Sequence, residues 1–273
     1  MTEGFLSPKS DIIFKLLFGD TGSIEMLTDF LKSVLRLPAD DYEDVTLIDP
    51  HLKREYEGDK LGILDVRVRT KTKKIIDIEI QLLPSPELRE RVVFYLAKMI
   101  TEQVGAGEPY SKIKRAISII ITDYPLIPDS EKYHNRYTLN DLETKTEFTD
   151  IIEINTLELV KLPELEDGSE LWNWLKFLSA ERKEDLEMIA EKSPQVKKAV
   201  VRLMELSNDE RTRLLFESRQ KMEWDNKARE RGALKEQALA IAEKMLRRNR
   251  PIDEIVDDTG LKREEVESLR LTN

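Results

Sequence analysis

The segment that most restricts the fold is RAISIIIT at residues 115–122, a nearly continuous run of β-branched and other apolar residues. A strand of this composition is typical of a sheet covered on both faces. Helical periodicity precedes it in three places, at residues 10–19, 23–37 and 87–104. Strands flanked by helices in this way predict an α/β domain, which we expect at residues 1–160.

Two alternating runs, GILDVRVRT at 62–70 and KIIDIEIQLL at 74–83, predict a β-hairpin. In the second run Asp77, Glu79 and Gln81 share one face, and isoleucines occupy the other. Antiparallel pairing can place Asp65 opposite Glu79, with their Cβ atoms about 5 Å apart. Two carboxylates at that distance repel each other, and a divalent cation between them would neutralise the pair.

Asp and Glu oxygens, without Cys or His, select a hard cation such as Mg²⁺ or Mn²⁺. The chain has no cysteine, and its two histidines, His51 and His134, are expected in loops. A bound hard cation lowers the pKa of a water ligand and stabilises charge on a phosphoryl oxygen, which is the chemistry of phosphodiester hydrolysis. A D-x-E-x-Q pattern is also common on a solvent-facing strand, so the hairpin alone leaves both interpretations open.

Charge and hydropathy narrow the classes of protein further. The net charge of −10 argues against a uniformly basic DNA-coating protein, but locally basic stretches at 53–74 and 219–250 keep a nucleic-acid partner open. The N-terminus does not resemble a signal peptide, and no apolar window approaches 18 residues. We therefore expect a soluble cytoplasmic protein without a membrane partner.

The second part of the chain, residues 161–273, is expected to be a mainly helical region. It contains a long charged helix at 208–248 and two short helices around a turn at Gly260. This ending resembles a helix-turn-helix, but the donors Lys262 and Arg263 are followed at once by acidic residues that would repel phosphates. We favour helical packing or a homo-oligomer contact over a DNA-reading role.

Four segments, in order, resemble the recombination-promoting nuclease (Rpn) family, also called PD-(D/E)xK nuclease family transposase: LSPKSDIIFKLLFGD, ILDVRV, IDIEIQ and RVVFYLAKMITEQVGAGEPYSKIKRAISIIITDYPL. The likeness runs from Leu6 to Leu162. It implies an α/β fold with a restriction-endonuclease-like (PD-(D/E)xK) core and a mainly helical C-terminal extension. It also implies a Mg²⁺-dependent, largely sequence-nonspecific DNA endonuclease that promotes recombination or transposition.

The resemblance assigns the first metal-binding acid to Asp65 and the second to Glu79. In the hypothesis of a metal-dependent nuclease, the Ile80 backbone carbonyl is a further ligand. Gln81 stands where the wider superfamily usually has lysine, and glutamine is common there in this family. A neutral amide cannot supply the positive charge that lysine offers to the attacking water or the transition state. Gln81 could still orient water or phosphate.

Other candidates each have a structural alternative. Lys15, on the first helix, could contribute the missing cation or pair with Asp11 four residues earlier. Glu25, on the second helix, is a candidate third metal ligand or a solvated surface acid. Gln103 and Tyr110 could contact the substrate backbone, or they could cap and pack the end of their helix.

Two functions from different classes follow. The leading hypothesis is a metal-dependent DNA endonuclease, favoured by the two facing acids Asp65 and Glu79. The alternative is a catalytically inactive nuclease-fold protein that acts as a binding module or scaffold, favoured by the net charge and by Gln81 in place of lysine. A nuclease that acts on RNA is a third option.

Overall fold

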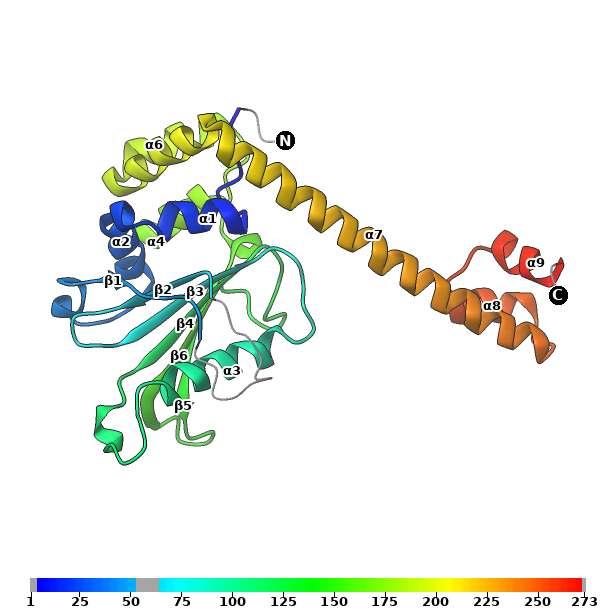
Figure 1. Cartoon of the computed structure of the whole chain (residues 1–273), viewed down its shortest axis with the longest axis horizontal. Coiled ribbons are helices and arrows are strands. Elements are labelled where there is room, and N and C mark those ends of the chain that lie inside the picture. The colour runs from blue at the N-terminus through cyan, green and yellow to red at the C-terminus, as the bar shows by residue number, and fades with distance from the viewer. Residues whose placement is uncertain (1–3, 53–63, 272–273) are drawn as a thin grey trace. The chain divides into compact units, whose positions relative to one another are not determined.

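The computed structural model describes residues 4–52 and 64–271, and its contacts divide the chain into two compact units between Arg213 and Leu214. Figure 1 shows the elements of each unit. Gly62 and Ile63, which the sequence assigns to the first hairpin strand, lie outside the described residues, as does most of the basic stretch before Leu64.

The first unit is built on a mixed sheet that contains the predicted hairpin and the predicted buried strand. In the described residues the sheet has six strands in the order β1-β2-β3-β4-β6-β5. Their bounds are Thr46–Leu47 (β1), Val66–Arg69 (β2), Ile75–Gln81 (β3), Ala116–Thr122 (β4), His134–Asn140 (β5) and Glu147–Glu158 (β6). The central strands β3, β4 and β6 run parallel, and the flanking pairs are antiparallel. Every residue of β4 is buried, as its apolar run predicts for a strand covered on both faces.

Helices from both ends of this unit cover one face of the sheet (Figure 1). They are α1 (Asp11–Phe18), α2 (Ile24–Val34), α4 (Glu170–Leu178), α5 (Lys183–Lys192) and α6 (Pro194–Asn208). The ring centroid of Trp174 lies 5.7 Å from that of Phe18 and 5.9 Å from that of Phe30, so α4 shares the aromatic core of α1 and α2. The division expected near residue 160 therefore falls inside this unit.

The opposite face is covered by α3, Leu88–Thr101, which connects β3 to β4 (Figure 1). Its buried stripe is Leu88, Val92, Leu96 and Met99, at the spacing that places side chains on one side of a helix. This stripe packs on apolar residues of β3 and β4. Val93 is 58% exposed, because it lies about 100° around the helix from Val92 and so outside this stripe.

Short 3₁₀ turns complete the connections: Thr21–Ser23 (η1), Ala39–Tyr42 (η2), Tyr110–Lys112 (η3) and Leu159–Lys161 (η4). η3 follows the end of α3, and it brings the chain back toward the start of β4.

The second unit contains most of the long helix α7 (Glu210–Arg247), followed by α8 (Ile252–Thr259) and α9 (Arg263–Leu271). Gly260 ends α8 in the left-handed conformation, with φ of 66°, which glycine adopts without steric cost. Ala242, Ile255, Leu261 and Val266 form a small buried cluster. The long charged helix and the two short helices therefore agree with the sequence. None of the described helices has the length and apolar character needed to cross a bilayer.

Candidate active site

The pairing of β2 with β3 determines which acids face each other. Val66 pairs with Ile78, and Arg67 pairs with Asp77. Asp65 stands one position before the first paired residue of β2, and its charge acts on Glu79, so the two acids lie near each other at this end of the strands. Their sharing of one face of the hairpin stays a prediction from the alternation in the sequence.

Asp65 lies just before β2 and is held from two directions. Its Oδ2 accepts a hydrogen bond from the backbone N–H of Ile80, at 3.0 Å. Its Oδ1 lies 2.8 Å from the Nζ of Lys15, on α1. The first helix, α1, therefore brings the Lys15 cation to Asp65. This agrees with the interpretation in which Lys15 contributes a cation to the site.

Glu79 and its neighbour Asp77 are buried beneath α3, with 7% and 1% of their surfaces exposed. The interpretation of this strand face as solvent-facing is therefore wrong for these two acids. Burial and the charge of Asp65 raise the pKa of Glu79 to about 7, against the opposing charges of Arg91 and Lys15. Burial, then the charges of Glu79 and Asp65, raise the pKa of Asp77 well above its ordinary value.

Arg91, in the first turns of α3, is a site residue that the sequence analysis missed. Its Nη2 donates a hydrogen bond of 3.0 Å to Gln81 Oε1 and lies 3.9 Å from Glu79 Oε2. The Gln81 amide nitrogen in turn donates to the carbonyl of Leu83, at 3.0 Å. A guanidinium thus stands beside the position where a lysine is missing. The sequence did contain a signal that could have identified Arg91: it directly precedes Val92, a residue of the buried stripe of α3, and α3 follows β3.

Tyr95 lies one helical turn beyond Arg91. Burial first, and then the charge of Glu79, raise the pKa of its phenol. This shift indicates that the ring lies within the field of the acid pair.

The carboxylates fit a hard divalent cation by their chemistry. Asp65 and Glu79 offer only oxygen donors, which Mg²⁺ and Mn²⁺ prefer. Asp77 Oδ1 is buried without a hydrogen-bond partner in the part of the chain that the structure describes, although Ser118 donates to its other oxygen at 3.3 Å. Residues 4–52 and 64–271 contain no cluster of three or more acids or histidines placed to hold a metal. A cation here would therefore need backbone or water oxygens as well.

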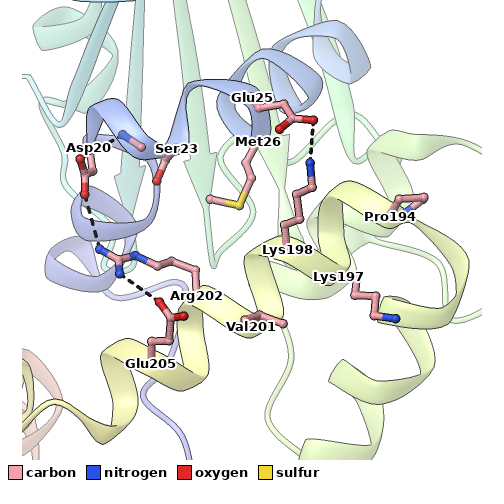
Figure 2. Close-up of a pocket in the computed structure, with 11 residues that line it drawn as sticks. Asp20, Ser23, Glu25, Met26, Pro194, Lys197, Lys198, Val201, Arg202 and Glu205 are labelled. Carbon is pink, nitrogen blue, oxygen red and sulfur yellow. Dashed lines mark hydrogen bonds and ion pairs between the residues drawn. The ribbon is translucent and has the colours of Figure 1, made fainter.

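Glu25 is not brought to this pair. Its carboxylate lies 2.6 Å from Lys198 Nζ and accepts a hydrogen bond of 2.9 Å from Gln195, both on α6. Figure 2 shows Glu25 and Lys198 pointing toward each other across a pocket of about 620 Å³ between α2 and α6. The hydrogen bond from Lys198 is the main cause that lowers the pKa of Glu25. The acid serves here as a contact between two helices.

Gln103 and Tyr110 follow the end of α3, away from the turns that carry Arg91. Gln103 Nε2 donates to the carbonyls of Met99 and Lys114, at 3.1 and 3.0 Å, and its Oε1 accepts from the Lys114 N–H at 2.7 Å. The Gln103 side chain thus joins the end of α3 to the next segment. This agrees with the interpretation of Gln103 as a residue that caps the end of its helix. Tyr110 is 82% exposed.

Comparison with curated proteins gave no significant match, and neither did comparison with solved structures. A family model described as PD-(D/E)XK nuclease family transposase matches residues 8–233, well over half of the 273-residue chain. The match includes the sheet, all the helices that cover it and the start of α7. It agrees with the resemblance carried by the four segments between Leu6 and Leu162. The chain belongs to the PD-(D/E)XK nuclease family transposase family.

Proposed function

We propose that this protein is a divalent-metal-dependent DNA endonuclease, largely indifferent to sequence, that acts in recombination or transposition. The observation that carries the proposal is a pair of neighbouring acids, Asp65 just before β2 and Glu79 in β3, with a cation from α1 on the first and a cation from α3 beside the second. Membership of a nuclease and transposase family supports DNA as the substrate.

In this proposal Asp65 and Glu79 hold Mg²⁺ or Mn²⁺, and the Ile80 carbonyl adds a ligand from the same strand. When bound there, the cation would lower the pKa of a water molecule and stabilise negative charge on a phosphoryl oxygen. The Ile80 N–H keeps the Asp65 carboxylate turned toward β3, which preorganises the pair. Gln81 orients the water or the phosphate.

Arg91 supplies the positive charge that Gln81 lacks. A guanidinium presents several N–H donors in one plane, a geometry that suits the non-bridging oxygens of a phosphodiester. Its contacts with Gln81 and Glu79 hold it at the edge of the site. Lys15 adds a second cation, and its side chain is 41% exposed, so it can also reach a substrate phosphate.

A second function is favoured by the same ion pairs. Lys15 and Arg91 neutralise part of the charge on Asp65 and Glu79 without any metal. A protein of this kind could keep the nuclease fold as a DNA-binding scaffold and no longer cleave.

The test is cleavage of supercoiled plasmid in Mg²⁺ by the wild-type protein, Asp65→Asn and Glu79→Gln, with Glu25→Gln as a matched carboxylate control. We expect the first two variants to lose about 100-fold or more, beyond the 10–100-fold typical of residues that only support a ligand. Glu25→Gln should cleave like wild type. Full cleavage by both site variants would refute the proposed site. DNA binding without cleavage in any divalent ion would establish the scaffold function.

A further inference from the structure

A second hollow lies on the α3 side of the sheet, further along β2 from the acid pair. Its volume is about 700 Å³. Arg67 and Arg69 line it and pair with Asp77 and Ile75 of β3, so they share the face that carries Glu79. The other lysines that line it are Lys73 in the hairpin turn and Lys112 and Lys114 after α3. Two acids, Asp49 and Glu102, line it as well, and the Asp49 carboxylate lies 2.8 Å from the His51 ring.

Some of these basic groups are already neutralised. Arg67 Nη2 lies 2.7 Å from Glu102 Oε2, and Lys112 Nζ lies 2.5 Å from Glu108 Oε1. The remaining cations, Arg69, Lys73 and Lys114, are exposed, and none has an ion-pair partner among the described residues. Three unmatched positive charges therefore face one hollow, in a protein whose net charge is −10.

These three cations stand on ordered backbone. Lys73 occupies the β2–β3 turn with φ of 70°, and its N–H donates to the Thr70 carbonyl at 2.9 Å. Both backbone polar groups of Lys114 are bonded to the Gln103 side chain. Arg69 is the last residue of β2. Cations carried on ordered backbone lose less entropy on binding an anion than those of a flexible tail would.

We propose that this hollow, called here the basic groove (Arg69, Lys73 and Lys114), binds the sugar–phosphate backbone of duplex DNA beside the cleavage site. The inference rests on the proposed function, because it extends the same site to its substrate. Four residues of β2 separate Arg69 from Asp65, about 13 Å along a strand. Duplex DNA rises 3.4 Å per base pair, so the contact falls about four base pairs from the scissile bond. DNA is favoured over RNA by the transposase family.

The test measures binding in EDTA, where no cleavage occurs, by fluorescence anisotropy of a labelled 30-base-pair duplex between 50 and 200 mM salt. The groove variant is Arg69→Gln/Lys73→Gln/Lys114→Gln. The control, Lys132→Gln/Lys145→Gln/Lys197→Gln, removes the same charge from exposed lysines outside the groove and outside the basic stretch 219–250. Each lost phosphate contact should reduce the slope of log K against log salt by about 0.9, so the groove variant should lose about 2.7.

We expect the groove variant to bind the duplex at least tenfold more weakly at the lowest salt and the control to bind within twofold of wild type. Equal salt slopes in the wild type, the groove variant and the control would contradict DNA binding by the groove. The same titration with a 30-base-pair RNA duplex tests the nucleic acid: if the groove variant loses affinity for RNA alone, the assignment to DNA is wrong. These binding measurements need neither a metal nor turnover, so their result is independent of the plasmid assay. A protein that does not cleave can still bind DNA through the groove, and a protein that cleaves can lack this contact.

A footprint on the wild-type protein covers the case in which the groove variant does not fold. Lysine acetylation with and without duplex DNA, read by mass spectrometry, should show protection of Lys73 and Lys114. Lys132 and Lys197 should react equally in both samples. Equal modification of all four lysines would contradict the proposal.

Discussion

Arg91 and Gln81 illustrate how a charge can be supplied by a neighbour in space when the expected position lacks it. The two residues are ten positions apart and belong to different elements, yet they share a hydrogen bond of 3.0 Å. The neutral amide therefore does not leave the acid pair without a cation. The functional consequence depends on the guanidinium, and this can be tested with single substitutions.

We expect Arg91→Gln to reduce plasmid cleavage about 100-fold, because a fixed donor beside the reacting phosphate is lost. Arg91→Lys should keep part of the activity, since it retains the charge but not the planar fork. Arg89→Gln, on the same helix, is the matched control, because its guanidinium donates to the carbonyl of Leu126, which follows β4. Equal activity of Arg91→Gln and wild type would remove Arg91 from the site.

Asp41 is a buried carboxylate outside the site whose charge contributes to stability. It accepts hydrogen bonds from Lys74 at 2.6 Å and Thr70 at 2.9 Å, and also from Thr72. Burial opposes the charged form of Asp41, but these donors outweigh burial and hold its pKa below the ordinary 3.8. Its stabilising effect is therefore complete above about pH 5 and is lost as pH falls below 3.8.

Asp41→Asn should lower the free energy of unfolding at pH 7 by about 3 kcal/mol, because Lys74 is left without its partner. The difference from wild type should shrink as the pH falls from 7 toward 2.5, because the wild-type protein progressively loses the charge of Asp41 below pH 3.8. Urea unfolding at both pH values measures this. Asp40→Asn, an exposed neighbour, serves as the control. A difference that grows toward acid pH would contradict the assigned charge state.

Among the elements, α3 has the largest influence on the site. It covers the sheet face of Asp77 and Glu79, it carries Arg91 and Tyr95, and its end is joined to Lys114 by Gln103. The helix was expected from its periodicity over 87–104, and it spans Leu88–Thr101. Its position over the acids was not part of that expectation. Burial under α3 is what separates these carboxylates from those of an ordinary exposed strand.

Leu96→Ala, at a position that is 1% exposed in the middle of α3, should destabilise the protein by about 2–5 kcal/mol through the cavity it leaves. Val93→Ala, at a position that is 58% exposed on the same helix, should change stability by less than about 0.5 kcal/mol. Thermal unfolding of the two variants checks which side of α3 faces the sheet. Similar losses in both would show that the helix is differently rotated.

Considered as a whole, the chain forms two compact units. The first is built around the sheet, and the second contains the small apolar cluster around Ile255 in α7, α8 and α9. A unit of about sixty residues with so small a core has little stability to spare. All the proposed site and groove residues belong to the first unit. A substitution that disrupts the apolar cluster of the second unit should therefore leave DNA cleavage unchanged.

Ile255→Asp places a charge at a position with no exposed surface, and we expect it to unfold the second unit. Circular dichroism should record a loss of helix, while plasmid cleavage stays within twofold of wild type. Asp257→Asn, an exposed position on the same helix, should change neither. A parallel loss of cleavage would show that the second unit takes part in the reaction.

The sequence by itself determined the buried central strand, the hairpin and the long C-terminal helix, and it predicts a common face for Asp65 and Glu79. These are local properties, since side chains alternate along a strand and repeat every 3.6 residues along a helix. The tertiary structure decided the rest. The contacts of Arg91 with Gln81 and of Lys15 with Asp65, and the pairing of Glu25 with Lys198, join different elements. Such contacts depend on how elements pack, and no local period encodes that packing.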